Sequence, residues 1–369
     1  MSTIKNNKNN KHNFFMNLAY LQARKSLGNT LGNPPVGCVI VNKNNEVISY
    51  GKTGINGIPH AEYNAIKKIK YKMKNLSLYV TLEPCAHFGK TPPCTKLIID
   101  KQISKVFYSV HDVDKITSKK AKNLLTKKKI KVNTGINKKQ IDEFYKFYYK
   151  NRIDKLPYVT AKLAISKDFY IKNILNKNIT NCSSRKVSHY FRSINNGIMI
   201  SGKTLLDDDP MLDCRINGLN KFSPTKIILD KNLSIPINSK IIKNSSKNKI
   251  IIIYNKKDYS KIEKLKKKKI KLIHLNVNKN KMFNLKKVLK ILYKNKIYRL
   301  IIEGGKKLTT SLIDGSLIDE FLLFKSNKNL NKNGKINVRP LIKKINFIKK
   351  NERLINTNLY NDKIINFKF

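Results

Sequence analysis

The 369-residue chain has no tryptophan, few cysteines, few acidic residues and no long apolar run. Its five cysteines are an odd number and too few for a disulfide-built scaffold, which favours a reduced compartment with metal-binding or catalytic thiols. The longest apolar run, 250–254, is far shorter than the roughly 18 residues of a membrane helix. Residues 1–13 are rich in Asn and Lys and lack the apolar core of a secretory signal. We therefore expect a cytoplasmic protein with no membrane partner.

The shortage of acidic residues leaves a strong positive charge. Lys and Arg number 77 against 23 Asp and Glu, so the formal net charge is +54. Such a charge can serve nucleic-acid binding, but a binding patch should be local, whereas Lys, Asn and Ile are abundant from end to end. These are the residues that an A/T-rich codon supply delivers. We therefore favour compositional drift over a nucleic-acid partner, although the field would attract anionic substrates such as phosphate esters.

Apolar periodicity predicts two successive series of strands and helices, and the length fits two domains at roughly 150 residues each. Strand and helix alternate in both series, which predicts α/β layered sheets. We expect strands at 36–41, 78–82, 105–110 and 130–132 in the first series, and at 158–166, 197–201, 225–230, 250–254, 270–274, 298–302 and 319–324 in the second. A linker at 154–157 follows a closing helix at 141–151. The predicted domains are therefore 1–151 and 152–369.

One group of residues in the first series has metal-binding chemistry. His60 and Glu62 open a predicted helix, and Cys85 and Cys94 follow the next strand. One imidazole and two thiolates leave the fourth tetrahedral position of Zn²⁺ open for water, and zinc lowers the pKa of that water toward about 7. Glu62 is close enough to move protons without being a ligand, which is the signature of zinc nucleobase deaminases. We expect His60, Cys85 and Cys94 to bind Zn²⁺, and interpret His87 as a loop or substrate-contact residue.

The spacing of the two cysteines points to one deaminase family. Eight residues separate Cys85 from Cys94, a wider spacing than in nucleic-acid editing deaminases. This loop, together with Asn33 and the segment 34–39 that follows it, resembles the pyrimidine deaminase of riboflavin biosynthesis. The resemblance implies that Asn33 helps to hold the substrate base and Lys90 its phosphate. From the residues alone, Asn33 is also an ordinary turn residue and Lys90 one lysine among many.

The resemblance continues into the second series, where it is similar to the reductase fused to that deaminase. It rests on the segment 201–215, on Arg192 in the preceding helix, and on Glu303-Gly304-Gly305 after a strand, and it spans about 14–324. It implies a cytidine-deaminase-like α/β/α layered N-terminal domain and a dihydrofolate-reductase-like α/β C-terminal domain that uses NADPH. The substrate contacts it implies in the second domain are Arg192, Leu212, Arg215 and Glu303. The cofactor contacts are Ala164, Asn178, Thr204, Asp208 and Gly305.

Elementary chemistry is compatible with several of these roles. Arg192 and Arg215 could clamp a phosphate, and Glu303 could accept hydrogen bonds from a substrate. Gly305 before a helix could let backbone N–H groups approach a pyrophosphate. The chain departs from the family near the cofactor: Phe169 stands where a glycine is usual, and Asn178 where a tryptophan is usual. Lys306 and Lys307 replace a small pair after Gly305.

The preferred interpretation is a bifunctional enzyme of riboflavin biosynthesis. Its deaminase would act on 2,5-diamino-6-ribosylamino-4(3H)-pyrimidinone 5′-phosphate, and its reductase would convert the ribosyl chain to ribityl with NADPH. One alternative is an active deaminase with a degenerate reductase domain. Another is a basic nucleic-acid-binding or editing relative, which the long loop between Cys85 and Cys94 argues against. The sequence does not decide between a monomer and a homo-oligomer, or between NADPH and NADH.

Overall fold

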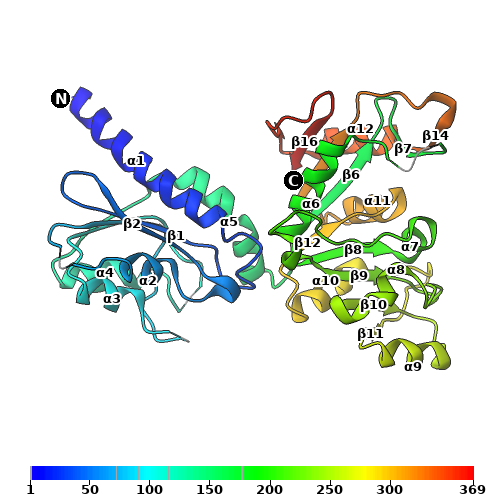
Figure 1. Cartoon of the computed structure of the whole chain (residues 1–369), viewed down its shortest axis with the longest axis horizontal. Helices are drawn as coiled ribbons and strands as arrows, with labels where there is room; N and C mark the ends of the chain where they lie inside the picture. Colours follow the sequence, from blue (N-terminus) through cyan, green and yellow to red (C-terminus); the bar gives the residue numbers. More distant parts are fainter. Residues whose placement is uncertain (1, 72, 90, 115, 176–177) are drawn as a thin grey trace. The chain divides into compact units, whose positions relative to one another are not determined.

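The computed structural model describes residues 2–71, 73–89, 91–114, 116–175 and 178–369, with the backbone alone for residues 2–9. These residues form two compact units, Met1–Lys155 and Leu156–Phe369 (Figure 1). The helix that ends the first unit, α5 (Lys138–Ile153), continues two residues beyond the expected boundary at 151. No helix among the described residues is both long and apolar enough to cross a membrane.

The sheet of the first unit runs in the order β2-β1-β3-β4-β5. Strand β1 is antiparallel to both of its neighbours, whereas β3, β4 and β5 are mutually parallel. The middle strands are buried apolar segments, and the edge strands are largely exposed. The bounds are β1 (Gly37–Val41), β2 (Val47–Lys52), β3 (Ser77–Leu82), β4 (Lys105–Val110) and β5 (Lys131–Thr134).

Helices cover both faces of this sheet. In Figure 1, α1 and α5 lie on one face and α2, α3 and α4 on the other. Two glycines allow the close packing: a Cβ on Gly37 would lie 1.9 Å from the carbonyl oxygen of Ala19 in α1, and a Cβ on Gly51 would lie 2.1 Å from that of Ala61 in α2. The remaining bounds are α1 (Ser2–Arg24), α2 (Ala61–Ile66), α3 (Cys94–Asp100) and α4 (Lys120–Lys127).

The sheet of the second unit runs in the order β11-β10-β9-β8-β12-β6-β13-β16-β15. The strands from β11 to β13 are parallel, and β16 and β15 add an antiparallel edge. A separate antiparallel pair joins β7 (Tyr170–Asn173) to β14 (Gly334–Asn337). The bounds are β6 (Tyr158–Ile165), β8 (Gly197–Ser201), β9 (Thr225–Leu229), β10 (Ile250–Tyr254), β11 (Lys271–His274), β12 (Arg299–Ile302), β13 (Glu320–Lys325), β15 (Asn351–Leu354) and β16 (Lys363–Lys368).

Two apolar cores lie on the two faces of this second sheet. One contains buried side chains of α10, α11 and α12, and the other contains those of α7, α8 and α9. The unit is thus a layered α/β domain, and the expected fold class is confirmed for both halves. The bounds are α6 (Cys182–Ser193), α7 (Gly202–Asp208), α8 (Lys240–Lys243), α9 (Tyr259–Lys267), α10 (Leu285–Lys294), α11 (Lys306–Asp314) and α12 (Arg339–Ile348).

Candidate active sites

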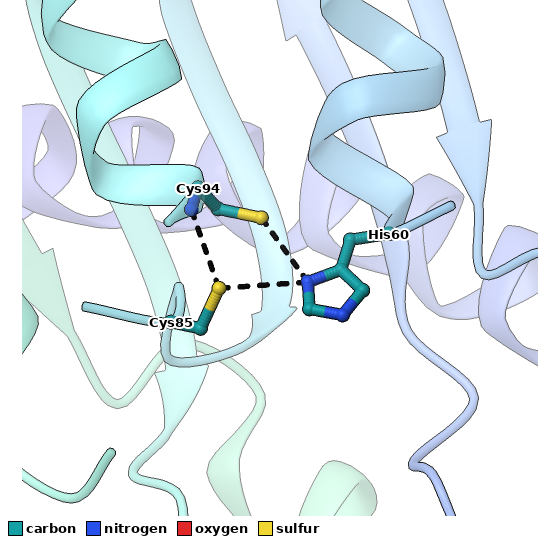
Figure 2. A group of neighbouring side chains, drawn as sticks. All are labelled: His60, Cys85 and Cys94. Carbon is teal, nitrogen blue, oxygen red and sulfur yellow. Dashed lines mark hydrogen bonds between the residues drawn. The ribbon is translucent and has the colours of Figure 1, made fainter. Parts of the chain in front are cut away.

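His60, Cys85 and Cys94 come together in the first unit, as Figure 2 shows. His60 is the N-cap residue of α2, Cys94 is the first residue of α3, and Cys85 lies in the loop after β3. The Nδ1 atom of His60 lies 3.3 Å from Sγ of Cys94 and 3.5 Å from Sγ of Cys85. A tetrahedral zinc ion bonded to nitrogen and sulfur would set such N···S distances at about 3.6 Å. The three donor atoms, all within 4.8 Å of one another, therefore fit a zinc ion.

The electrostatics of this cluster suit proton transfer. Glu62 lies in the first turn of α2 and is only 3% exposed, and burial raises the pKa of its carboxyl to about 7. A hydrogen bond from the Cys94 thiol lowers the pKa of Cys85 to about 4, and the hydrogen bond to Cys85 raises the pKa of His60 to about 9. A carboxyl group that titrates near neutral pH can both accept and return a proton.

Asn33 lies against the loop that leads to His60. Gly57, three residues before His60, has a φ of +90°, and a Cβ there would lie 2.1 Å from Nδ2 of Asn33. Glycine is therefore required at position 57 both by the left-handed backbone and by the close approach of Asn33. The hydroxyl of Tyr145 donates to the carbonyl oxygen of Pro35 at 3.0 Å and holds the segment after Asn33. Lys90 lies outside the described residues.

Glu83, two residues before Cys85, is a buried carboxylate that the sequence interpretation overlooked. It accepts hydrogen bonds from the backbone N–H groups of Lys119 at 2.9 Å and Ala121 at 3.1 Å, and it contacts Nδ1 of His111 at 3.0 Å. It thereby ties the cysteine loop to the start of α4. His87 makes a second link between the two loops, with Nδ1 3.2 Å from the hydroxyl of Thr117. An acidic residue directly before Pro84 and Cys85, in so basic a chain, was the available signal.

We expect Glu83→Gln to lower the free energy of unfolding by about 1–3 kcal/mol, because the amide NH₂ would face backbone donors and leave one of them without an acceptor. Chemical denaturation and the zinc content per chain, measured on the same samples, would check this. Glu46→Gln is the matched control, since Glu46 accepts a hydrogen bond from Asn42 at the exposed surface. Equal stability of the two variants would show that Glu83 does not hold the loop.

A second charged cluster lies in the other unit, where Arg192 of α6 meets Glu303 after β12. Nε and Nη2 of Arg192 each donate to Glu303 at 2.8 Å, and Nη1 donates to the carbonyl oxygen of Asp213 at 2.9 Å. Burial alone would raise the pKa of Glu303, but the charge and hydrogen bonds of Arg192 outweigh it and lower the pKa to about 2. Two expected substrate contacts are thus joined in one bidentate ion pair.

Lys162 of β6 is a further member of this cluster that sequence reasoning missed. Burial lowers the pKa of its ammonium group, the nearby Glu303 raises it, and Arg192 lowers it. The ammonium nitrogen lies 5.0 Å from the ring centre of Phe324. Lys162 and Ala164 are two residues apart on one strand, so they point to the same face of the sheet. Lys162 is the one charged residue in the mostly apolar segment 158–166, but a lysine stands out little in so basic a chain.

The other expected substrate contacts differ in their surroundings. The side chain of Arg215 is 67% exposed, and its Nε lies 3.6 Å from Oδ1 of Asp213. Leu212 is 3% exposed and packs in the apolar core beside Ile198 and Ile228. Because the core takes the side chain of Leu212, any ligand contact at this position has to come from its main chain.

The expected cofactor contacts gather where parallel strands end. Ala164 is next to last in β6, Thr204 follows β8, and Gly305 is the N-cap residue of α11 after β12. A Cβ on Gly305 would meet no atom of the described residues within 4 Å, so a ligand can approach its backbone closely. The carboxyl group of Asp208, at the end of α7, lies 3.8 Å from Nζ of Lys172. Asn178 is an exposed residue between β7 and α6.

Phe169, which stands where a glycine is usual in the family, adopts a left-handed conformation with φ of +73°. Non-glycine residues rarely adopt this conformation, and bulky ones least of all. The phenyl ring contacts two cations, Nζ of Lys325 at 5.1 Å and the guanidinium of Arg339 at 4.9 Å from the ring centre. These contacts hold the turn after β6. Lys306, a second departure, begins α11 and donates to the carbonyl oxygen of Asn337 at 3.1 Å.

Comparison with known proteins gives a consistent result for both units. Residues 157–363 match the family model of the RibD C-terminal domain, and residues 9–110 match the cytidine and deoxycytidylate deaminase zinc-binding region. The riboflavin biosynthesis protein RibD of Aquifex aeolicus is 33% identical over 359 residues, which cover 96% of this chain and 97% of that protein. The RibD of Bacillus amyloliquefaciens is 32% identical over 309 residues, covering 83% of this chain and 82% of its own length.

Solved structures agree on the fold over the full length. A deaminase/reductase from Thermotoga maritima superimposes with a TM-score of 0.81 at 24% identity, and covers 98% of this chain and 99% of its own. Acinetobacter baumannii RibD, in its form 1, gives a TM-score of 0.80 at 25% identity with the same coverage. Sequence relatives and solved structures thus match both units together. The chain therefore belongs to the RibD family of riboflavin biosynthesis proteins, with a zinc-binding deaminase domain followed by an NADPH-using reductase domain.

Proposed function

We propose that the domain 1–151 hydrolytically removes the 2-amino group of 2,5-diamino-6-ribosylamino-4(3H)-pyrimidinone 5′-phosphate, and that the domain 152–369 then reduces the ribosyl chain to ribityl with NADPH. The observation that supports the first step most strongly is the meeting of His60, Cys85 and Cys94 beside the buried carboxyl of Glu62. A small phosphate ester is the proposed ligand, in the cytoplasm, with no role for nucleic acid.

In the deamination, His60, Cys85 and Cys94 are the proposed zinc ligands, and zinc supplies Lewis acidity that makes water nucleophilic near neutral pH. Glu62 takes a proton from the attacking water and delivers one to the departing nitrogen. The ring carbon thereby exchanges its amino group for oxygen, with ammonia as the second product. In this assignment Asn33 holds the ring and Lys90 the phosphate.

In the reduction, NADPH supplies a hydride to the anomeric carbon of the ribosyl group. The ring oxygen that leaves this carbon must gain a proton, and we assign its delivery to Lys162. Glu303, kept ionised by Arg192, accepts hydrogen bonds from the sugar hydroxyls. Three of the five N–H groups of Arg192 are occupied by Glu303 and Asp213, so two remain for the phosphate, which Arg215 and the main chain of Leu212 also contact.

The proposed cofactor site lies at the carboxyl ends of the parallel strands in the second unit. Ala164, Asn178, Thr204, Asp208 and Gly305 are the proposed NADPH contacts, since ligands of open α/β sheets bind at the carboxyl ends of the strands. The open space over Gly305 supports an approach of the diphosphate to the start of α11.

Removal of zinc tests whether the two proposed activities belong to separate domains, only one of which needs the metal. We expect a chelator such as dipicolinate to lower ammonia release from the pyrimidinone phosphate at least about 100-fold, because the metal is needed to activate water. Oxidation of NADPH with the deaminated intermediate should change less than twofold, since no proposed reductase residue binds the metal. Restoring Zn²⁺ should restore ammonia release. Ammonia release from a chain shown to be zinc-free would refute the assignment, and no NADPH oxidation by the intact enzyme would favour a degenerate reductase.

A further inference from the structure

The backbone around Asn33 is held by an unusually complete set of hydrogen bonds. Each main-chain carbonyl group from residue 32 to residue 36 accepts a hydrogen bond from a residue outside this stretch. The donors, in chain order of the carbonyl groups, are Nη2 of Arg152 at 3.3 Å, Oγ1 of Thr30 at 2.6 Å, Oγ1 of Thr53 at 3.3 Å, the hydroxyl of Tyr145 at 3.0 Å and the backbone N–H of Thr53 at 2.9 Å. A loop whose carbonyl groups bond to the protein in this way is fixed in place, unlike a loop that bonds to water.

Tyr145 of α5 supplies its hydrogen bond from the interior of the first unit. Its side chain is fully buried, and its hydroxyl also lies 2.7 Å from Oγ1 of Thr81 in β3. A phenol has one proton, which Tyr145 donates to the carbonyl oxygen of Pro35, so the Thr81 hydroxyl has to donate to Tyr145. Oγ1 of Thr81 accepts the backbone N–H of Gly37 at 3.1 Å. A continuous chain of hydrogen bonds thus runs from Gly37 through the two side chains to Pro35.

This segment lies beside the proposed zinc site. Strand β1 is antiparallel to β3, so the entry to β1 is at the same edge of the sheet as the loop after β3, which contains Cys85. Asn33 itself lies against Gly57 in the loop that leads to His60. The position of the Asn33 amide relative to the proposed zinc ligands therefore depends on where the backbone of 33–37 is held.

Tyr145 is not suited to transfer protons itself. Burial raises the pKa of its hydroxyl well above the usual range, and the nearby carboxyl of Glu62 raises it further. The hydroxyl therefore keeps its proton near neutral pH and serves as a fixed donor to Pro35. Any effect of Tyr145 on the reaction has to pass through the segment that it holds.

We propose that Tyr145 is a positioning residue of the deaminase, which fixes the segment 33–37 and thereby sets the affinity of Asn33 for the substrate base. A side chain that is already aligned before the substrate arrives loses less conformational entropy on binding, so the complex is tighter. The proposed zinc ligands and Glu62 receive no hydrogen bond from Tyr145 in the part of the chain that the structure describes. This inference rests on the proposed function, in which Asn33 holds the ring.

The kinetic test replaces Tyr145 by phenylalanine, which removes the hydroxyl and keeps the ring. The KM for the pyrimidinone phosphate should rise about five- to tenfold, the usual effect of one hydrogen bond, and kcat should change less than about twofold. Zinc content and NADPH oxidation should equal those of the wild type. Tyr149→Phe is the matched control, since Tyr149 lies on the same helix but donates to Asp142 at 2.9 Å. A KM that rises no more than in the control, or a loss confined to kcat, would overturn the proposal.

A double-mutant cycle tests whether Tyr145 acts through Asn33. In a chain that already contains Asn33→Ala, the further change Tyr145→Phe should alter the KM less than about twofold, because residues that act together are not additive. The same five- to tenfold rise in both backgrounds would show that Tyr145 affects the substrate by another route, and the proposal would fail.

Hydrogen exchange needs no substrate and so separates this inference from the proposed function. In the full zinc-loaded chain, the amides of Val36 and Gly37 should exchange at least about tenfold faster in Tyr145→Phe than in the wild type, and Tyr149→Phe should leave them unchanged. If they do, but the wild type releases no ammonia from the pyrimidinone phosphate, the proposed function fails while the anchoring of 33–37 by Tyr145 stands. If ammonia is released and neither the exchange nor the KM responds to Tyr145→Phe, the positioning role fails alone.

Discussion

Replacing Glu62 by glutamine is expected to lower the rate of ammonia release by a factor of about 10²–10⁴, the usual contribution of a positioned acid–base group. The carboxyl is buried beside the three proposed zinc ligands, and burial raises its pKa to about 7. Glutamine keeps the size of the side chain but cannot take a proton from water and return it to the leaving amine. The loss should therefore fall on kcat, with the KM for the pyrimidinone phosphate nearly unchanged.

The controls on the Glu62→Gln variant are its zinc content and the activity of its second domain. Glu62 is not a proposed ligand, so the glutamine variant should keep one zinc ion per chain. It should also oxidise NADPH at the wild-type rate when given the deaminated intermediate. A variant that retains zinc and releases ammonia within threefold of the wild-type rate would remove Glu62 from the mechanism. A variant that loses zinc would assign the residue to the metal site.

The second large effect is expected from Glu303→Gln, which leaves the charge of Arg192 without its counter-ion. Removing one partner of a buried ion pair costs about 3–5 kcal/mol of unfolding free energy. The side chains of Arg192 and Glu303 are only 12% and 13% exposed, so water screens their charges little. The variant should therefore show most of this loss of unfolding free energy. The reduction should fail as well, because Glu303 is a proposed substrate contact.

The stabilisation by this ion pair should decrease as the pH falls. Glu303 has a folded-state pKa of about 2, below its ordinary value of 4.5. The ion pair therefore stabilises the fold fully above pH 4.5, and its contribution is lost as the pH falls from 4.5 toward 2. Urea unfolding at pH 7 and pH 3 should show the gap between wild type and variant shrinking at the lower pH.

Glu263→Gln is the matched control for the Glu303 experiment. Glu263 also pairs with a cation, Lys266, but both side chains are about 60% exposed, and such pairs contribute at most about 1 kcal/mol. If Glu303→Gln lowers the free energy of unfolding no more than Glu263→Gln does, the buried pair adds nothing to stability. The same conclusion would follow if the loss caused by Glu303→Gln did not change with pH.

The zinc cluster could be predicted from sequence because its metal-binding and acid–base residues lie in two short motifs. His60 and Glu62 lie on one helical turn, and the two cysteines flank one loop. Arg192 and Glu303 were each marked as substrate contacts, but their mutual ion pair was not foreseen. They are 111 residues apart, and only the fold shows that two N–H groups of Arg192 are directed at the two carboxylate oxygens of Glu303. Lys162 was hidden for a different reason, since one lysine carries little information in a chain so rich in lysine.

Two elements that the sequence did not predict share a physical cause. Strand β2 is an edge strand whose side chains are half exposed, and α9 contains only two buried side chains, Ile262 and Leu265. Neither presents the apolar periodicity on which a prediction depends. The sequence also left open whether the Lys-rich tail after 327 folds. In the structure β16 pairs antiparallel with β13, and Ile364 and Phe367 are buried.

Gly37 and Gly51 lie between the sheet and its helices in the first unit, and they limit how far the composition of this chain can change. Every glycine codon begins with two guanines, so an A/T-rich codon supply, which is our favoured explanation for the many lysines and asparagines, would work against glycine. The chain has only 15 glycines. At Gly37 and Gly51 a methyl group would overlap a helix backbone, so even alanine does not fit there. Under such a bias surface residues would be free to change, but these two positions would not, because a helix packs against the sheet there too closely for any side chain.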